Sequence, residues 1–223
     1  MKTMFPKLGS FLPKQTKNSK SSDEDTLVIT RAYVFKGNLI ATDKSSLLVF
    51  NLREFLKFYH QLDDSENPTE AIELIDRLVE ELEGKALTAE FFNIFSKPTK
   101  INDVQDGRIF VSKEGLHSEF LLDEVFPQEK LEDYLINNWS IHWKAERTEQ
   151  GNFAVPGSVI KKLQSVAGGE LIADNLVFKR TTDDHAAFCL TEKEFFYGIV
   201  PYALEGESSV MVFIEGNDFF ESF

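Results

Sequence analysis

The sequence has little of what proteins outside the cell or within membranes depend on. Cysteine occurs once among 223 residues, at Cys189, so the chain cannot form an internal disulfide. No stretch approaches the ~20 continuous apolar residues of a membrane-spanning helix, and residues 1–6 contain no apolar segment of the secretory type. We therefore expect a cytoplasmic protein, encoded by a cell or by a phage that multiplies inside one.

Positive charge is also scarce. The chain has 24 lysine and arginine residues against 37 aspartate and glutamate residues, which gives a net charge of −13. Phosphate contacts need clustered lysine and arginine, so this balance argues against a protein that coats nucleic acid over its whole surface. A local basic face remains compatible with it.

Motifs of catalysis are missing as well. The sequence contains no glycine-rich phosphate loop, nucleophile elbow or HExxH helix, and His60, His117 and His142 have no cysteine or histidine at ligand spacing. The run Asp183-Asp184-His185 offers metal-binding groups, but neighbours on a strand point to opposite faces and a polar turn explains the run equally well. We predict no enzyme, no metal and no cofactor.

Phenylalanine is abundant. It occurs 21 times in a chain that is 42% hydrophobic, which indicates globular structure with phenylalanine-rich cores. The length fits one large or two small domains.

One stretch organises the chain, residues 27–52. A β-rich run over residues 27–35 is followed by turn chemistry at Lys36-Gly37-Asn38 and by Leu39-Ile40. A polar turn at residues 41–46 then leads into a third apolar run at residues 47–50. These patterns predict a three-stranded antiparallel meander.

Ala41-Thr42-Asp43, followed by Leu47, resembles the "ATDGHRLA" strand pair of bacterial β-type DNA sliding clamps. The match is partial, because Lys44-Ser45-Ser46 stands where the family commonly has Gly-His-Arg, and an ordinary polar turn is the alternative. Residues 198–202 resemble a strand that ends some clamp domains, with its methionine missing. The resemblance implies an α+β fold whose helices line a ring and carry positive charge in an otherwise acidic protein.

Helix-then-strand patterns recur along the chain, which is the periodicity a clamp subunit would have. We predict helices at residues 4–12, 53–62, 69–82, 88–95, 131–139 and 155–166, and further strands at 108–112, 117–122, 140–145, 171–179, 186–191, 195–202 and 210–214. Residues 97–107 are expected to form a loop. The predicted architecture is two similar domains, residues 1–126 with a helical insertion at 53–84 and an acidic outer helix face, and residues 127–223. Chance recurrence of helix and hairpin is the alternative.

Lysines gather at the predicted repeat helices. The candidate DNA-binding residues are Lys7, Lys14, Lys97, Lys100, Lys161 and Lys162. If these helices face one way, the lysines would track phosphates without reading bases, whereas lysines scattered on exposed helix faces are the alternative. The acidic, phenylalanine-rich end supplies a candidate partner-docking peptide with Phe219, Phe220 and Phe223, unless these rings pack back on the sheet.

The resemblance and the lysines together predict a non-catalytic, sliding-clamp-like processivity factor. Such a protein would form a homo-oligomeric ring around duplex DNA and would tether a DNA polymerase or meet a clamp loader. The alternative is a phage structural or assembly protein, or a protein-interaction module, that does not bind DNA.

Overall fold

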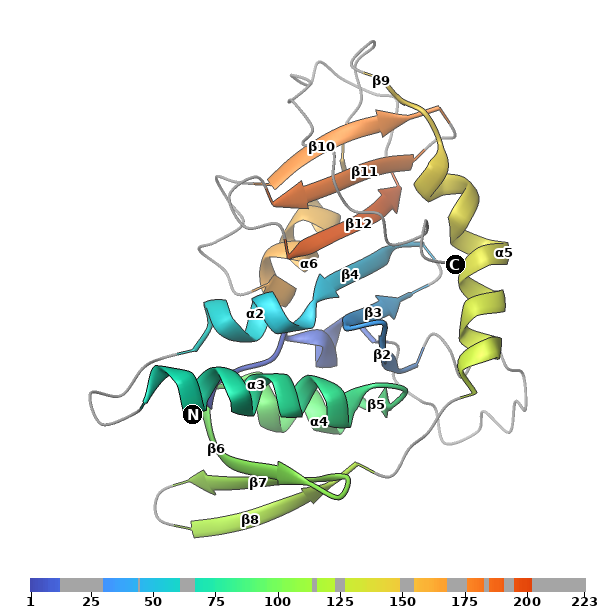
Figure 1. Ribbon diagram of the computed structural model, residues 1–223. Helices are drawn as coiled ribbons and strands as arrows, with labels where there is room; N and C mark the ends of the chain where they lie inside the picture. The colour runs from blue at the N-terminus through green and yellow to red at the C-terminus, as the bar shows by residue number, and fades with distance from the viewer. Residues whose placement is uncertain are drawn as a thin grey trace, which may run out of the picture.

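Two antiparallel β-sheets with helices packed on them make up the computed structural model (Figure 1). It describes residues 1–12, 30–43, 45–60, 67–113, 116–122, 127–148, 155–167, 176–182, 185–190 and 195–201. The combination of helices with antiparallel strands confirms the predicted α+β class.

The larger sheet has eight strands and joins both halves of the sequence. In spatial order they are β5 (Ala86–Leu87), β2 (Ala32–Phe35), β3 (Asn38–Thr42), β4 (Leu47–Asn51), β12 (Phe196–Pro201), β11 (His185–Leu190), β10 (Leu176–Thr181) and β9 (Arg147–Thr148). Strands β2, β3 and β4 form the predicted meander. Strand β4 pairs with β12, where the rings of Phe50 and Phe196 stack at 4.4 Å. Strands from both sides of the predicted boundary at residue 126 therefore belong to one continuous sheet. The division into two domains stays a prediction.

Both faces of the larger sheet are covered around β4. Leu48 and Phe50 point into one core, and Leu47 and Val49 point into a second core on the opposite face. The first core lies under the helices η1 (Leu8–Ser10), α2 (Leu52–Phe58), α3 (Pro68–Leu82), α4 (Ala89–Phe95) and α6 (Gly157–Ala167). The second core is closed by α5 (Gln128–Lys144). Burial on both faces explains why these strands read as continuous apolar runs.

Helix α5 corrects one sequence prediction. The strand expected at residues 140–145 is wrong, because the helix continues to Lys144. Trp139 and Trp143 lie one helical turn apart, and both are buried in the second core. This contact with a sheet distant in sequence keeps the segment helical.

The smaller sheet has the order β1 (Lys2–Thr3), β6 (Thr99–Gln105), β7 (Arg108–Lys113) and β8 (Leu116–Leu121). The predicted hairpin is β7 and β8. The loop predicted at residues 97–107 is wrong, since most of it forms β6. A bulge between Ile101 and Asp103 allows Ile101 and Val104 to be buried together, which breaks the two-residue alternation that marks a strand in sequence.

Among the elements that the structure describes, the order of a two-residue strand, a helix and three antiparallel strands occurs three times. The three units are β1-η1-β2-β3-β4, β5-α4-β6-β7-β8 and β9-α6-β10-β11-β12, with α2 and α3 between the first two and α5 before the third. In the first two units the leading strands are exchanged, because β1 pairs with β6 and β5 pairs with β2. Internal duplication as the origin of this order stays a prediction.

The helix predicted at residues 4–12 is wrong except for the single 3-10 turn of η1. The main chain before it forms hydrogen bonds with two other helices. The Phe5 N–H donates to the Phe95 carbonyl (2.7 Å), and the Lys7 N–H donates to the Val166 carbonyl (2.8 Å). Pairing with the ends of two other helices has replaced local helix formation. The strand predicted at residues 210–214 lies outside the described residues.

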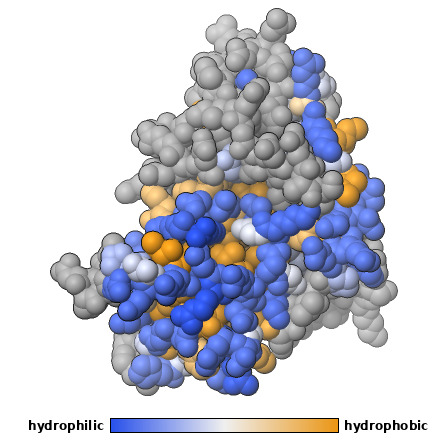
Figure 2. All heavy atoms as spheres, in the orientation of Figure 1, coloured by the Kyte–Doolittle hydropathy of each residue, from blue (hydrophilic) through white to orange (hydrophobic). Residues whose placement is uncertain are grey.

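The two helices expected at residues 53–84 are α2 and α3, whereas their status as an insertion stays a prediction. Part of their acidic face has a structural role. The carboxylate of Glu83 accepts the N–H groups of Lys36 (2.6 Å) and Gly37 (3.0 Å), and Glu81 accepts that of Gly107 (2.9 Å). Lys36, Gly37 and Gly107 have positive φ, as two-residue hairpin turns require. Helix α3 thus holds the first turns of two meanders, and Figure 2 shows the largely hydrophilic surface over it.

Candidate nucleic-acid interface

The helices of the three units meet at residues 5–7. The two hydrogen bonds to the Phe95 and Val166 carbonyls place this segment between the last turns of α4 and α6. They also satisfy carbonyl groups that a helix end leaves without an intrahelical partner. Helix η1 then packs closely on α4, where a Cβ at Gly9 would lie 2.9 Å from Asn93 Oδ1.

Three of the predicted lysines are exposed around this junction. Lys7 lies in the joining segment, Lys97 follows the last turn of α4, and Lys161 lies on α6, about 7.5 Å along the helix axis from Val166. Within the described part of the chain, none of the three forms an ion pair. Their positive charges therefore remain uncompensated by a direct contact.

Arginine side chains of the described surface behave differently. Arg53 pairs with Asp76 at 2.6 Å, Arg77 with Asp103 at 3.0 Å, and Arg108 with Glu119 at 3.2 Å. These pairs are solvent-exposed, and exposed pairs contribute only ~0–1 kcal/mol each. Their consequence here is electrostatic, because the positive charges of these three arginines are each compensated by a neighbouring carboxylate.

Lys100 lies apart from the other lysines. It stands opposite Lys2 in the β1–β6 pairing, and both side chains are exposed. The next residue, Ile101, is fully buried toward the helix-covered core. Since successive side chains alternate between faces, Lys100 points away from η1 and α4.

Lys162 is engaged inside the protein. Its ammonium forms an ion pair with the Asp43 carboxylate and lies 4.4 Å from the centroid of the Phe11 ring. Adjacent lysines on α6 thus differ, since Lys161 is exposed and Lys162 is half-buried. Lys14, Phe219, Phe220 and Phe223 lie outside the described residues, as do Asp183 and Asp184.

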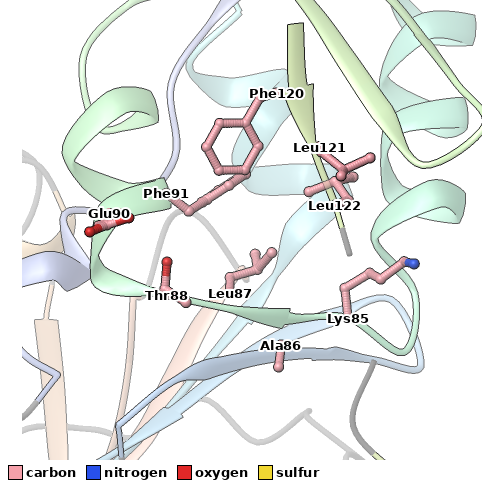
Figure 3. A pocket seen from close by; sticks show the side chains of 9 residues that line it. All are labelled: Lys85, Ala86, Leu87, Thr88, Glu90, Phe91, Phe120, Leu121 and Leu122. Atoms are coloured by element: carbon pink, nitrogen blue, oxygen red, sulfur yellow. The ribbon is translucent and has the colours of Figure 1, made fainter. Parts of the chain in front are cut away.

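A hollow beside α4 was not anticipated from the sequence (Figure 3). It has a volume of about 180 Å³ and is lined by Lys85, Ala86, Leu87, Thr88, Glu90, Phe91, Phe120, Leu121 and Leu122. Leu87, Phe91 and Leu122 are buried, whereas Leu121 is 54% exposed. Both polar and apolar groups are exposed in the hollow, and the only sequence signal for it is the apolar run 120–122 at the end of β8.

Within the ranges given above, no three histidine, cysteine, aspartate or glutamate residues are grouped so that they could hold a metal ion. None of the helices that the structure describes is long and apolar enough to cross a membrane.

Comparison with known proteins gives a weak likeness. No family model and no curated protein matches the sequence. Among solved structures, the chain is similar to a protein from Eubacterium rectale assigned as a DNA polymerase III beta subunit, with 14% identity and a TM-score of 0.38. The match covers 93% of this chain and 66% of that one, so the chain spans slightly less than two thirds of its length. The likeness concerns the fold alone.

Proposed function

We propose that this protein is a non-catalytic factor of the sliding-clamp type, which acts in the cytoplasm, encircles duplex DNA as a homo-oligomeric ring and tethers a DNA polymerase or meets a clamp loader. The observation that carries the proposal is the set of exposed, unpaired lysines Lys7, Lys97 and Lys161 at the junction of η1, α4 and α6. The partial sequence resemblance around Asp43 is consistent with it. The two domains, 1–126 and 127–223, belong to the same proposal.

The chemistry of these lysines suits contact with DNA that must move. An ammonium on a flexible stem is a point charge that can follow phosphates, and it does not impose the bidentate geometry of arginine. The remaining surface is acidic enough to give a net charge of −13. It would repel DNA elsewhere and confine it to the lysine side. Binding of this kind is independent of base sequence and weakens steeply with salt.

The sheet edges supply a route to ring formation. Among the strands that the structure describes, β1 and β8 are the edges of the smaller sheet, and β5 and β9 are the edges of the larger sheet. An outermost strand presents main-chain N–H and C=O groups for pairing. Contact between two different edges is head-to-tail, and such contacts close into rings when the rotation allows it.

The experiment combines native mass spectrometry with retention on DNA. We expect a dimer or trimer at micromolar concentration that remains on circular duplex DNA, after loading, and leaves a linear duplex through its free ends. Blocking those ends should restore retention. A strictly monomeric mass, or equal retention on open linear and circular DNA, would contradict encirclement.

The end of the chain is proposed as the partner-docking peptide, with Phe219, Phe220 and Phe223 as anchors beside acidic residues. Deleting residues 216–223 is then expected to abolish polymerase capture in a pull-down while the melting temperature stays unchanged. Replacing only Asp218 and Glu221 by their amides is the control that keeps the rings. If the rings instead pack on the protein, burial of each would contribute roughly 1.5–3 kcal/mol to the free energy of unfolding. The deletion would then lower the melting temperature by several degrees.

The hollow beside Leu121 favours a second candidate, a structural or assembly protein that binds another protein and no DNA. In that case duplex DNA should not bind even at low salt. The protein should instead co-purify with particles or with one partner, and Leu121→Ser should weaken that association.

A further inference from the structure

Asp43 follows β3, and both oxygens of its carboxylate accept hydrogen bonds. Its side chain is 11% exposed. One oxygen, Oδ1, accepts hydrogen bonds from the N–H groups of Ser45 (3.2 Å) and Ser46 (2.9 Å) and from the Ser45 hydroxyl (2.9 Å). These bonds within the turn fix the direction of the carboxylate.

The second oxygen, Oδ2, reaches across the fold to α6. It accepts a hydrogen bond from the Lys162 ammonium, 119 residues away in sequence. The same ammonium lies over the face of Phe11, whose side chain is only 3% exposed. Lys162 therefore links α6 to the β3–β4 turn and to the segment after η1 at one point.

Helix α6 has other contacts besides Lys162. Leu163 and Val166, each 1% exposed, are its fully buried residues among those whose burial the structure describes, Val159 packs partly on the same core, and the Val166 carbonyl accepts a hydrogen bond from the Lys7 N–H. Ser158, Lys161 and Ser165 are exposed and share the opposite side of the helix, at the i, i+3, i+7 spacing. Adjacent helical residues differ by about 100° around the axis. Holding Lys162 at the side of α6 therefore contributes to the direction in which Lys161 points.

We propose that Asp43 is a positioning residue of the lysine interface: through Lys162 it fixes the rotation of α6, so that Lys161 faces outward. Lys162 then makes no contact with DNA, although it neighbours Lys161 and is chemically identical to it. The role assigned to Lys161 rests on the proposed function. The link between Asp43 and α6 does not.

A double-mutant cycle on the full chain tests the link without DNA. Asp43→Asn keeps an oxygen for the turn and removes the charge, and Lys162→Met keeps the side-chain length. Each is expected to lower the melting temperature by about 3–6 °C, and the double variant by no more than either one. Lys161→Gln is the control and should leave it unchanged. Additive shifts, or no shift, would overturn the link.

Amine acylation gives a readout of the accessibility of the two lysines. In the unaltered protein Lys161 should react at least tenfold faster than Lys162, because Lys161 is exposed whereas Lys162 is half-buried against Asp43 and Phe11. Asp43→Asn should bring the rate of Lys162 close to that of Lys161. Equal rates in the unaltered protein would overturn the proposal.

The affinity for duplex DNA at about 150 mM salt distinguishes a positioning role of Asp43 from direct contact between Lys162 and phosphate. If Asp43 positions Lys161, Asp43→Asn weakens duplex binding several-fold, as Lys162→Met does. If Lys162 contacts phosphate itself, Asp43→Asn releases a cation and strengthens binding, which would overturn the proposal. Asp103→Asn removes the same charge from the Arg77 pair and controls for net charge. If the unaltered protein binds no DNA, the proposed function fails, and the cycle and the acylation rates still decide the link.

Discussion

Replacing Phe196 by alanine is expected to destabilise the protein by about 3–5 kcal/mol, the cost of truncating a fully buried aromatic ring. The ring is 0% exposed and stacks on Phe50 at 4.4 Å, where β12 pairs with β4. At about 2–4 °C per kcal/mol for a chain of this size, the melting temperature should fall by roughly 10 °C. Differential scanning calorimetry measures both quantities.

The form of the transition matters as much as its midpoint. Phe196 belongs to one core with residues from both halves of the chain. We therefore expect a single transition that moves as a whole, and Phe50→Ala should behave in the same way. Ile141→Ala is the control, because its side chain is 68% exposed and should contribute little. A variant in which only residues 127–223 melt early would contradict a shared core and would support two independent domains.

Charge reversal at Lys7, Lys97 and Lys161 is expected to lower the affinity for duplex DNA by about 100-fold at moderate salt. Each lost phosphate contact removes roughly one counterion-release step, so the slope of log K against log salt should become shallower by about 2.7. Fluorescence anisotropy at several salt concentrations gives both values. The fold should persist, because all three side chains are exposed and unpaired in the described structure.

A matched variant distinguishes local contact from net charge. Reversing Lys85, which precedes β5, and Lys130 and Lys144, which lie within α5, changes the total charge by the same amount on other parts of the surface. It should leave the salt slope unchanged. An equal loss in both variants would mean that the lysine junction has no special role. Lys7 and Lys97 would then act only as cations near the C-terminal ends of α6 and α4, where their interaction with the helix dipole stabilises the helix by ~0.3–1 kcal/mol.

Local sequence was enough for the elements whose determinants lie within a few residues. Asn67 caps α3 through the Thr69 N–H (3.0 Å), Pro68 occupies its first turn, and the apolar stripe of this helix is buried as its spacing predicts. The turn at Lys36-Gly37 was likewise recognised from local sequence, and the Glu83 carboxylate at the end of α3 adds two hydrogen bonds to it.

Only the tertiary structure decided features that depend on distant partners. Strand β6 was not predicted because a bulge buries Ile101 and Val104 in the same core, which breaks the alternation expected of a strand. Residues 140–144 are helical because Trp143 packs into the second core, on the opposite face of the larger sheet. The same holds for the two lysines of α6. Lys161 and Lys162 are identical in chemistry and adjacent in sequence, and what separates them is Asp43, 119 residues away. A sequence determines local preference, whereas charge compensation depends on which groups the fold brings together.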